Sequence, residues 1–235
     1  MYHISDDEPV KSSVKASYYQ PEYENVNIGL WESLQEEKEP NVDYSRYWHG
    51  TLSFLRPLFL VTDIEGARIV FAAIWIVLML LNMWLMWKQG AKALAICYLA
   101  AHIVMQAWVC ATCIQYSTMF FMMNAITLAG ICLFRKRKDT ESLRCKTGLL
   151  MAVSGVCTCF IDFLTAETLS LTVPLLVLLI LRYEAGELSE WKKEFKHLIT
   201  CVMIWGIGYA LMFVFKWILV AVFAGKEAVI LALSS

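Results

Sequence analysis

Three consecutive acids near the N-terminus, Asp6, Asp7 and Glu8, form the first group of residues that could do chemistry. Carboxylate oxygens bind divalent cations, and a carboxylate can also accept a proton as a general base. Asp6 and Asp7 are therefore the candidate catalytic residues, as base or as metal ligand. A solvated acidic loop is the alternative interpretation of the same cluster.

Cationic residues form the second group, and they lie in residues 44–60 and in the last apolar segment. On a helix with 3.6 residues per turn, Arg46, His49 and Arg56 share one stripe beside an apolar stripe. Arginine can hold phosphate through two hydrogen bonds. Lys216 lies about 10 Å inside the last apolar segment, where it can meet an anion or extend its stem outward. We therefore expect these four residues to bind a lipid phosphate.

The same strip, "YSRYWHGTLSFLRPLFL", has a simpler interpretation. A two-faced helix can lie in the outer membrane interface with its apolar side down, where Trp and Tyr are favoured. Pro57 would then end or bend the helix before the first span. In that case the strip is an anchor for the span and no binding site.

Asp162 and Glu167 bracket a turn in "IDFLTAETLS" and form the third group. They could border the side from which an acceptor hydroxyl approaches. Alternatively, Thr165 caps the next helix and Glu167 lies in its first turn, where an acid suits the helix dipole.

Four polar residues interrupt the apolar segments, and their cost in a membrane makes them informative. His102 and Gln106 are four apart and would share a helix face, while Asn82 and Asn124 lie in other segments. Interhelical hydrogen bonding is one interpretation, and a polar path for transport is the other. The eight cysteines lie mostly in apolar segments and indicate neither a disulfide framework nor a metal site.

The composition places these residues in a multi-pass membrane protein. The chain of 235 residues is 59% hydrophobic and 17% charged, and its net charge of −1 gives no sign of nucleic-acid binding. A spanning helix needs roughly 20 apolar residues. We expect an all-α bundle with an extracytoplasmic acidic segment at residues 1–67 and a transmembrane part at residues 68–235. The expected spans are residues 69–87, 93–113, 117–134, 147–164, 168–182 (bent by Pro174) and 198–223.

The cationic connections orient the bundle. Cytoplasmic loops are enriched in Lys and Arg, and three alternate loops carry the clusters around residues 88–92, 135–146 and 182–196. These loops are expected in the cytosol, which places residues 1–67 outside the cell membrane. Because no signal peptide precedes this tail, we expect the chain to be a piece of a longer protein with an upstream helix.

Three stretches, "YSRYWHG…FLRPL", "IDFLTAETLSLTVPL" and "WGIGYALMFVFKW", resemble a group of uncharacterised multi-pass membrane proteins of Gram-positive bacteria. The layout is also similar to that of GT-C-type glycosyltransferases, which use polyprenyl-phosphate-linked sugars. Those enzymes have a large outer loop with acidic residues and interfacial helices, and the resemblance makes Asp6 and Asp7 the nearest counterparts of the acids.

The resemblance implies a GT-C-like glycosyltransferase, or a remnant of one, whose partners are membrane lipids and a polyprenyl-phosphate-linked sugar. The alternative is a non-catalytic membrane protein, either a transporter-like element or an assembly partner.

Overall fold

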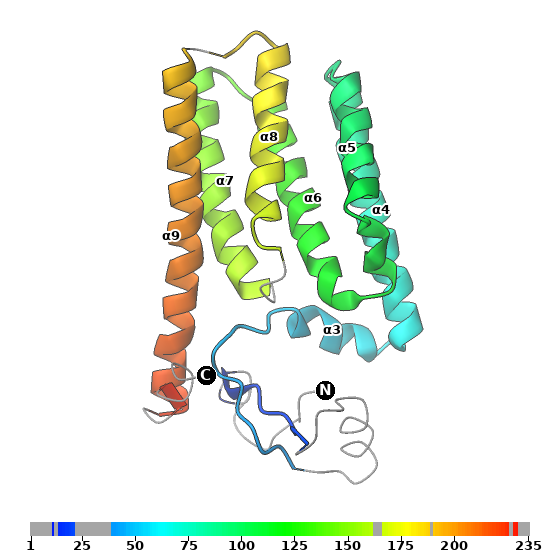
Figure 1. The fold of residues 1–235 in the computed structure, drawn as a ribbon, viewed down its shortest axis with the longest axis vertical. Helices are drawn as coiled ribbons and strands as arrows, with labels where there is room; N and C mark the ends of the chain where they lie inside the picture. Colours follow the sequence, from blue (N-terminus) through cyan, green and yellow to red (C-terminus); the bar gives the residue numbers. More distant parts are fainter. Residues whose placement is uncertain are drawn as a thin grey trace. The chain divides into compact units, whose positions relative to one another are not determined.

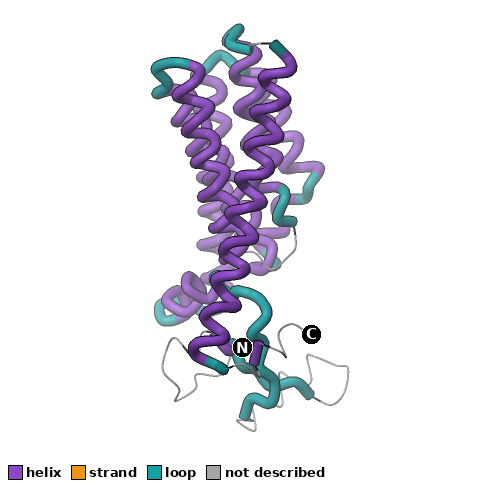
Figure 2. The backbone as a smooth tube through the Cα atoms, turned by 90° about the vertical axis from the view of Figure 1, so that its left-hand side faces the viewer, coloured by secondary structure: helices purple, strands orange, loops and turns teal. Residues whose placement is uncertain are grey.

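All regular elements that the structure describes are helices, as the sequence predicts. The computed structural model describes residues 11, 14–21, 39–161, 166–188, 190–225 and 228–229, with the backbone alone at Gln115. Within these ranges the extended backbone pairs at one isolated bridge, between Tyr18 and Val42, and Figure 2 shows helices joined by loops. The fold class is therefore all-α.

Every expected span corresponds to a helix. The elements are α3 (Leu52–Phe59), α4 (Ile64–Lys88), α5 (Lys92–Val104), the 3-10 helix η1 (Ala107–Ala111), α6 (Ile114–Arg135), α7 (Thr140–Ile161), α8 (Leu169–Glu184) and α9 (Trp191–Phe223) (Figure 1). Four of them, α4, α6, α7 and α9, are long and apolar enough to cross a membrane. The helix α5 is a shorter apolar helix, and α8 has 16 residues with Pro174 inside.

The chain forms two compact units. The N-terminal unit combines Met1–His49 with Met212–Ser235, and the helical unit is Gly50–Leu211, so the boundary passes through α9. In the N-terminal unit, backbone bonds pair Tyr18 with Val42, and the side chain of Asn41 bonds both backbone groups of Gln20. The N-terminal unit therefore contains both ends of the chain, because residues from Met212 onward pack on the N-terminal segment.

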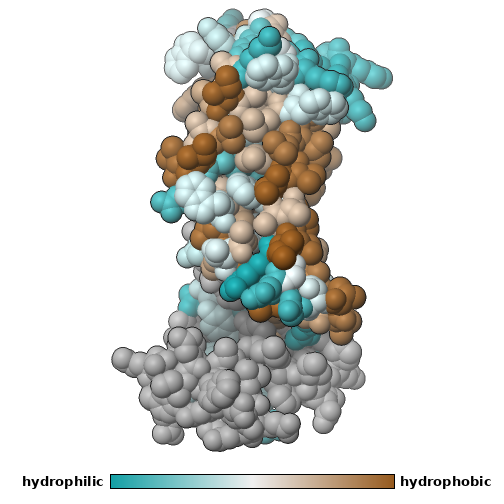
Figure 3. Space-filling model, turned by 90° about the vertical axis from the view of Figure 1, so that its right-hand side faces the viewer, coloured by the Kyte–Doolittle hydropathy of each residue, from teal (hydrophilic) through white to brown (hydrophobic). Residues whose placement is uncertain are grey.

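In the helical unit, α6 lies among α4, α7 and α8, and its buried face fills the core. Met123, Ile131 and Phe134 of α6 are buried, and Ile131 and Phe134 belong to one apolar cluster with residues of α4, α5 and α8. Figure 3, which views the bundle over α4 and α5, shows hydrophobic side chains along its middle and hydrophilic ones at one end. This is the pattern of a bundle whose middle lies in hydrocarbon.

The hydrophilic end, here called the basic end, gathers three connections. The α4–α5, α6–α7 and α8–α9 connections lie together there, at the top of Figure 1. The amines of Lys88 and Lys92 lie 4.0 and 5.4 Å from the ring centroids of Trp84 and Trp87. Arg137 adds a bidentate ion pair with Glu187 of the α8–α9 connection. The loops that the sequence assigns to one side of the membrane therefore share one end of the bundle.

The helix expected over residues 44–60 is shorter than predicted. Only Leu52–Phe59 is helical, and Pro57 lies inside this helix and does not end it. The preceding backbone is held against the end of α7, where the Gly50 N–H donates to the Phe160 carbonyl at 2.9 Å and the Thr51 hydroxyl donates to the Ile161 carbonyl at 2.9 Å. A Cβ at Gly50 would overlap the Phe160 carbonyl oxygen, so only glycine allows this approach.

The second expected span is also shorter than predicted. The helix α5 ends at Val104, and Gln106 adopts a left-handed conformation with φ of 52°. Gln106 therefore lies outside α5 and shares no helix face with His102, which corrects the expectation. The next α-helix begins at Ile114, where the Ser117 hydroxyl donates to the carbonyl of Cys110 at 2.9 Å and lies 3.3 Å from that of Cys113.

Candidate functional site

The N-terminal unit is built around the ammonium group of Lys216. This side chain is only 1% exposed. Its Nζ donates a hydrogen bond to the Val14 carbonyl at 2.7 Å and lies 5.1 Å from the ring centroid of Trp48. Among the described residues, no carboxylate lies within ion-pair distance of this amine. A buried charge held only by a neutral carbonyl and a ring is costly and calls for an anionic partner.

Aromatic rings surround this lysine on α9 and on the segment before Gly50. Trp48 is fixed by its indole N–H, which donates to the Met212 carbonyl at 2.9 Å, and by stacking on Phe215. Tyr47 meets Phe213 edge to face at 5.7 Å, and Phe213 meets Trp217 at 5.0 Å. These rings, here called the aromatic cluster, hold the residues of both segments in place. Within the described ranges, the indole nitrogen of Trp217 and the hydroxyl of Ser45 are buried without a hydrogen-bond partner.

His49 is buried beside the same cluster. Its Nε2 lies 3.3 Å from the Tyr44 carbonyl, and its ring lies 5.4 Å from the Tyr44 ring. Burial, opposed by the bond to the Tyr44 carbonyl and aided by the positive charge of Lys216, lowers the pKa of His49 from 6.5 to about 4. His49 is therefore neutral at pH 7, and its one N–H group donates to the Tyr44 carbonyl, so it offers a phosphate no charge.

This burial predicts acid sensitivity. The unfolded chain binds a proton near pH 6.5 and the folded chain only near pH 4, so the free energy of unfolding should fall as pH drops through this window. The loss attributable to His49 is on the order of 3 kcal/mol. Unfolding midpoints of the wild type and of His49→Gln, measured from pH 7 to pH 4, check it. The variant should show the shallower pH dependence, and equal slopes would contradict the assignment.

The predicted phosphate-binding residues divide between the two units. Arg46, His49 and Lys216 belong to the N-terminal unit, where the Arg46 guanidinium lies 5.2 Å from the ring centroid of Tyr47. Arg56 belongs to the helical unit and is exposed in the last turn of α3. The structure thus brings three of the four residues into one unit, and their binding of phosphate stays a prediction.

The acidic candidates are only partly described. Asp6, Asp7 and Asp162 lie outside the described residues, as does Thr165. Glu167 is half-buried and precedes α8, whose N-cap is Thr168, so the prediction that Glu167 lies in the first helical turn is wrong. The helix begins later because the Ser170 hydroxyl donates to the Glu167 carbonyl at 2.9 Å and closes the turn there.

Asn82, His102 and Asn124 meet in one buried cluster within the helical unit. The Asn82 amide donates to the Asn124 carbonyl at 2.9 Å, and the Tyr98 hydroxyl donates to the Asn124 side chain at 2.8 Å. Asn124 also lies 3.2 Å from His102 Nε2. These contacts tie α4, α5 and α6 together as interhelical hydrogen bonds. The residues gather at one point and do not line a path along the bundle.

Two arginines clamp a carboxylate near the basic end, and the sequence reasoning did not single out this cluster. Glu194 accepts from Arg182 Nη1 at 2.6 Å and Nη2 at 2.9 Å, and from Arg144 Nη2 at 2.6 Å. Arg182 and Glu194 are 5% and 6% exposed. The sequence does hold one indication of this cluster, because Arg182 is a charged residue at the end of an apolar segment.

Among the described residues, no group of three or more His, Cys, Asp or Glu side chains could hold a metal ion. Comparison of the chain with protein-family models, curated proteins and solved structures found no match.

Proposed function

We propose that this multi-pass protein lies in the cell membrane with its basic end in the cytosol and its N-terminal unit outside. The gathering of three cationic connections at one end of the helical unit supports this orientation, because Lys and Arg near the ends of spans are retained in the cytoplasm. The cations at this end are Lys88, Lys92, Arg135, Lys136, Arg137, Lys138, Arg144, Lys146, Arg182, Lys192, Lys193 and Lys196.

We further propose that the protein handles a polyprenyl-phosphate-linked sugar on its outer side, as a GT-C-like transferase. The buried ammonium of Lys216 is the observation that carries this proposal. One of its three N–H groups is bonded to Val14, which leaves two donors for phosphate oxygens. A cation that is buried away from water is costly unless an anion pairs with it, so the two remaining donors mark a candidate phosphate site. Arg46 supplies a second positive charge, and the neutral His49 belongs to the same unit.

In the proposed reaction, an acceptor hydroxyl attacks the anomeric carbon of the lipid-linked sugar. The bond from this carbon to the lipid phosphate oxygen breaks, and the lipid phosphate leaves with the electron pair. The hydroxyl proton passes to the carboxylate of Asp6 or Asp7. Lys216 and Arg46 would stabilise the additional negative charge on the leaving phosphate, which is a transition-state effect of the oxyanion-hole kind.

A non-catalytic membrane protein is the second candidate function. The bond from Lys216 to Val14 joins residues 202 apart in the chain, so this lysine can act as a structural pin between α9 and the N-terminal segment. The hydrogen bonds that tie Asn82, Tyr98 and Asn124 together also favour a structural role for these residues. In this candidate the protein is an assembly partner, and Lys216 binds no ligand.

The substitution Lys216→Met separates the two candidates. It keeps the side-chain length and removes the charge, and replacing a buried charge by an apolar side chain is often neutral or stabilising. If Lys216 binds phosphate, the full chain in detergent should hold a polyprenyl phosphate on the order of 10- to 100-fold more weakly, without loss of thermal stability. Binding can be measured by quenching of the intrinsic Trp fluorescence.

Lys88→Met is the matched control. Like Lys216, Lys88 belongs to a long apolar helix, and its amine lies 4.0 Å from the ring centroid of a tryptophan, Trp84. This variant should bind polyprenyl phosphate as the wild type does. A Lys216→Met protein that unfolds at a lower temperature yet binds the lipid normally would establish the structural pin and overturn the transferase proposal.

A further inference from the structure

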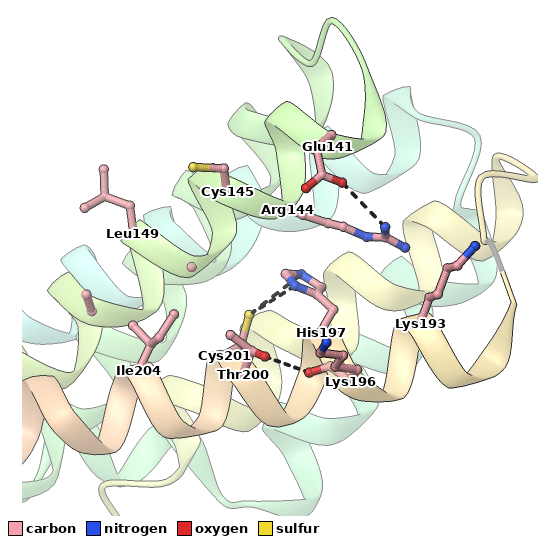
Figure 4. A pocket seen from close by; sticks show the side chains of 12 residues that line it. Glu141, Arg144, Cys145, Leu149, Lys193, Lys196, His197, Thr200, Cys201 and Ile204 are labelled. Atoms are coloured by element: carbon pink, nitrogen blue, oxygen red, sulfur yellow. Dashed lines mark hydrogen bonds and ion pairs between the residues drawn. The ribbon is translucent and has the colours of Figure 1, made fainter.

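A groove of about 710 Å³ lies between α7 and α9 near the basic end, and the proposed function does not use it (Figure 4). Its walls come from both helices. The lining residues are Glu141, Arg144, Cys145, Gly148, Leu149, Ala152, Lys193, Lys196, His197, Thr200, Cys201 and Ile204.

Small residues create this groove by letting the two helices touch farther along. A Cβ on Gly155 of α7 would overlap the Trp205 carbonyl oxygen, and one on Gly208 of α9 would lie 2.6 Å from the Ala152 carbonyl oxygen. Nearer the basic end, a Cβ on Gly148 would meet only the tip of Ile204, at 3.4 Å. The backbones therefore meet at Gly155 and separate toward the basic end, where Gly148 leaves the space unfilled.

The groove is cationic at its mouth and apolar farther in. Figure 4 shows Arg144 of α7 and Lys193 and Lys196 of α9 around the same opening. The lining itself carries three cations and one carboxylate, Glu141, which lies 3.7 Å from Arg144. Arg144 also donates to the buried Glu194, and Lys193 forms an exposed pair with Glu190 at 3.8 Å. Deeper along the groove, the walls are made by Leu149, Ala152 and Ile204.

This gradient matches a molecule with an anionic head and an apolar tail. Lys196 lies eight residues before Ile204, which is about 12 Å along α9 at helical rise. A phosphate at the mouth would therefore leave an acyl chain beside the apolar wall. Basic pockets between membrane helices on the cytoplasmic side bind lipid headgroups in this way.

We propose that the α7–α9 groove binds an anionic phospholipid, with the phosphate between Arg144, Lys193 and Lys196 and one acyl chain along Leu149, Ala152 and Ile204. The site lies at the basic end and stands independently of the proposed transferase. Its occupant is a lipid of the bilayer and not a free phosphate, because half of the wall is apolar.

Retention of phosphatidylglycerol by the purified full chain tests this site. The protein is exchanged into zwitterionic detergent with phosphatidylglycerol or phosphatidylcholine added, and bound lipid is counted by native mass spectrometry. Phosphatidylglycerol should be retained preferentially, and Lys193→Gln/Lys196→Gln should weaken its binding on the order of 10-fold. Lys192→Gln is the matched control, because it removes an exposed cation of the same helix that does not line the groove.

Cysteine labelling locates the lipid. Cys145 lines the groove and is exposed, whereas Cys97 of α5 is equally exposed but lies elsewhere, and each is five residues into its helix from the basic end. Phosphatidylglycerol should slow maleimide modification of Cys145 and leave Cys97 unchanged. Ala152→Leu, which fills the apolar wall, should abolish this protection.

Two outcomes would overturn the proposal. Equal retention of phosphatidylcholine and phosphatidylglycerol would mean that the groove holds bulk lipid without regard to charge. Protection of Cys145 by inorganic phosphate alone, undiminished in Ala152→Leu, would show that the cations bind a free anion and that the apolar wall plays no part.

Discussion

Replacing Arg182 by Met should lower the free energy of unfolding by roughly 3–5 kcal/mol, which is the typical cost of leaving a buried charge without its partner. Arg182 donates two hydrogen bonds to Glu194, and both side chains are almost fully buried. The variant loses both of these bonds and keeps the bond from Arg144 Nη2 to the carboxylate. Thermal unfolding in detergent, followed with a thiol-reactive dye that reports the eight free cysteines, measures the loss.

Two further variants show whether the stability lost in Arg182→Met comes from the lost charge partner or from lost packing. Glu190→Gln breaks the exposed pair with Lys193, whose closest N–O distance is 3.8 Å, and should change stability by less than about 0.5 kcal/mol. The double change Arg182→Met/Glu194→Leu removes both buried charges and should recover much of the loss. A double variant as unstable as Arg182→Met would show that packing, and not the orphaned carboxylate, decides the outcome.

Gly155→Ala should separate α7 from α9. The added methyl would overlap the Trp205 carbonyl oxygen and lie 3.0 Å from the Tyr209 backbone nitrogen. Neither is a flexible side chain, so the helices must move apart, and forced overpacking of this kind costs about 1–3 kcal/mol or more. Small residues allow close backbone approach in membrane bundles, and the same thermal unfolding measurement reports their loss.

Gly206→Ala is the control for this prediction. It lies on the same helix pair, and a Cβ there would meet nothing within 4 Å. Because alanine favours a helix over glycine by about 1 kcal/mol, Gly206→Ala should keep or raise the unfolding temperature. If Gly155→Ala behaves like Gly206→Ala, the close crossing of α7 and α9 is not a feature of the folded protein.

The sequence predicts the helices well because long apolar segments have few alternatives in a membrane. A helix satisfies its own backbone hydrogen bonds there, so each expected span corresponds to a helix of the structure. The ends are predicted less well, since distant contacts decide them. Nothing local in residues 44–51 shows that Gly50 bonds to Phe160, and a helical pattern continues through Gln106 although its backbone turns left-handed.

The candidate sites show the same division between local and distant information. Lys216 stands out in the sequence because a charge at its depth is costly. Its contacts with Val14 and Trp48 could not be predicted, because those residues are far away in the chain. The α7–α9 groove was also missed, since glycines and alanines spaced along a helix show where backbones can approach but not which helices meet.

The orientation of the bundle is the claim on which the proposed function depends most directly, because it places Lys216 and His49 outside and the phospholipid groove inside. Glu39→Cys and Lys138→Cys, each exposed, are introduced one at a time into a chain whose eight cysteines are replaced by alanine. Intact cells are then treated with a maleimide that does not cross membranes. We predict labelling at residue 39 at once and at residue 138 only after permeabilisation, and labelling of residue 138 alone in intact cells would contradict this orientation.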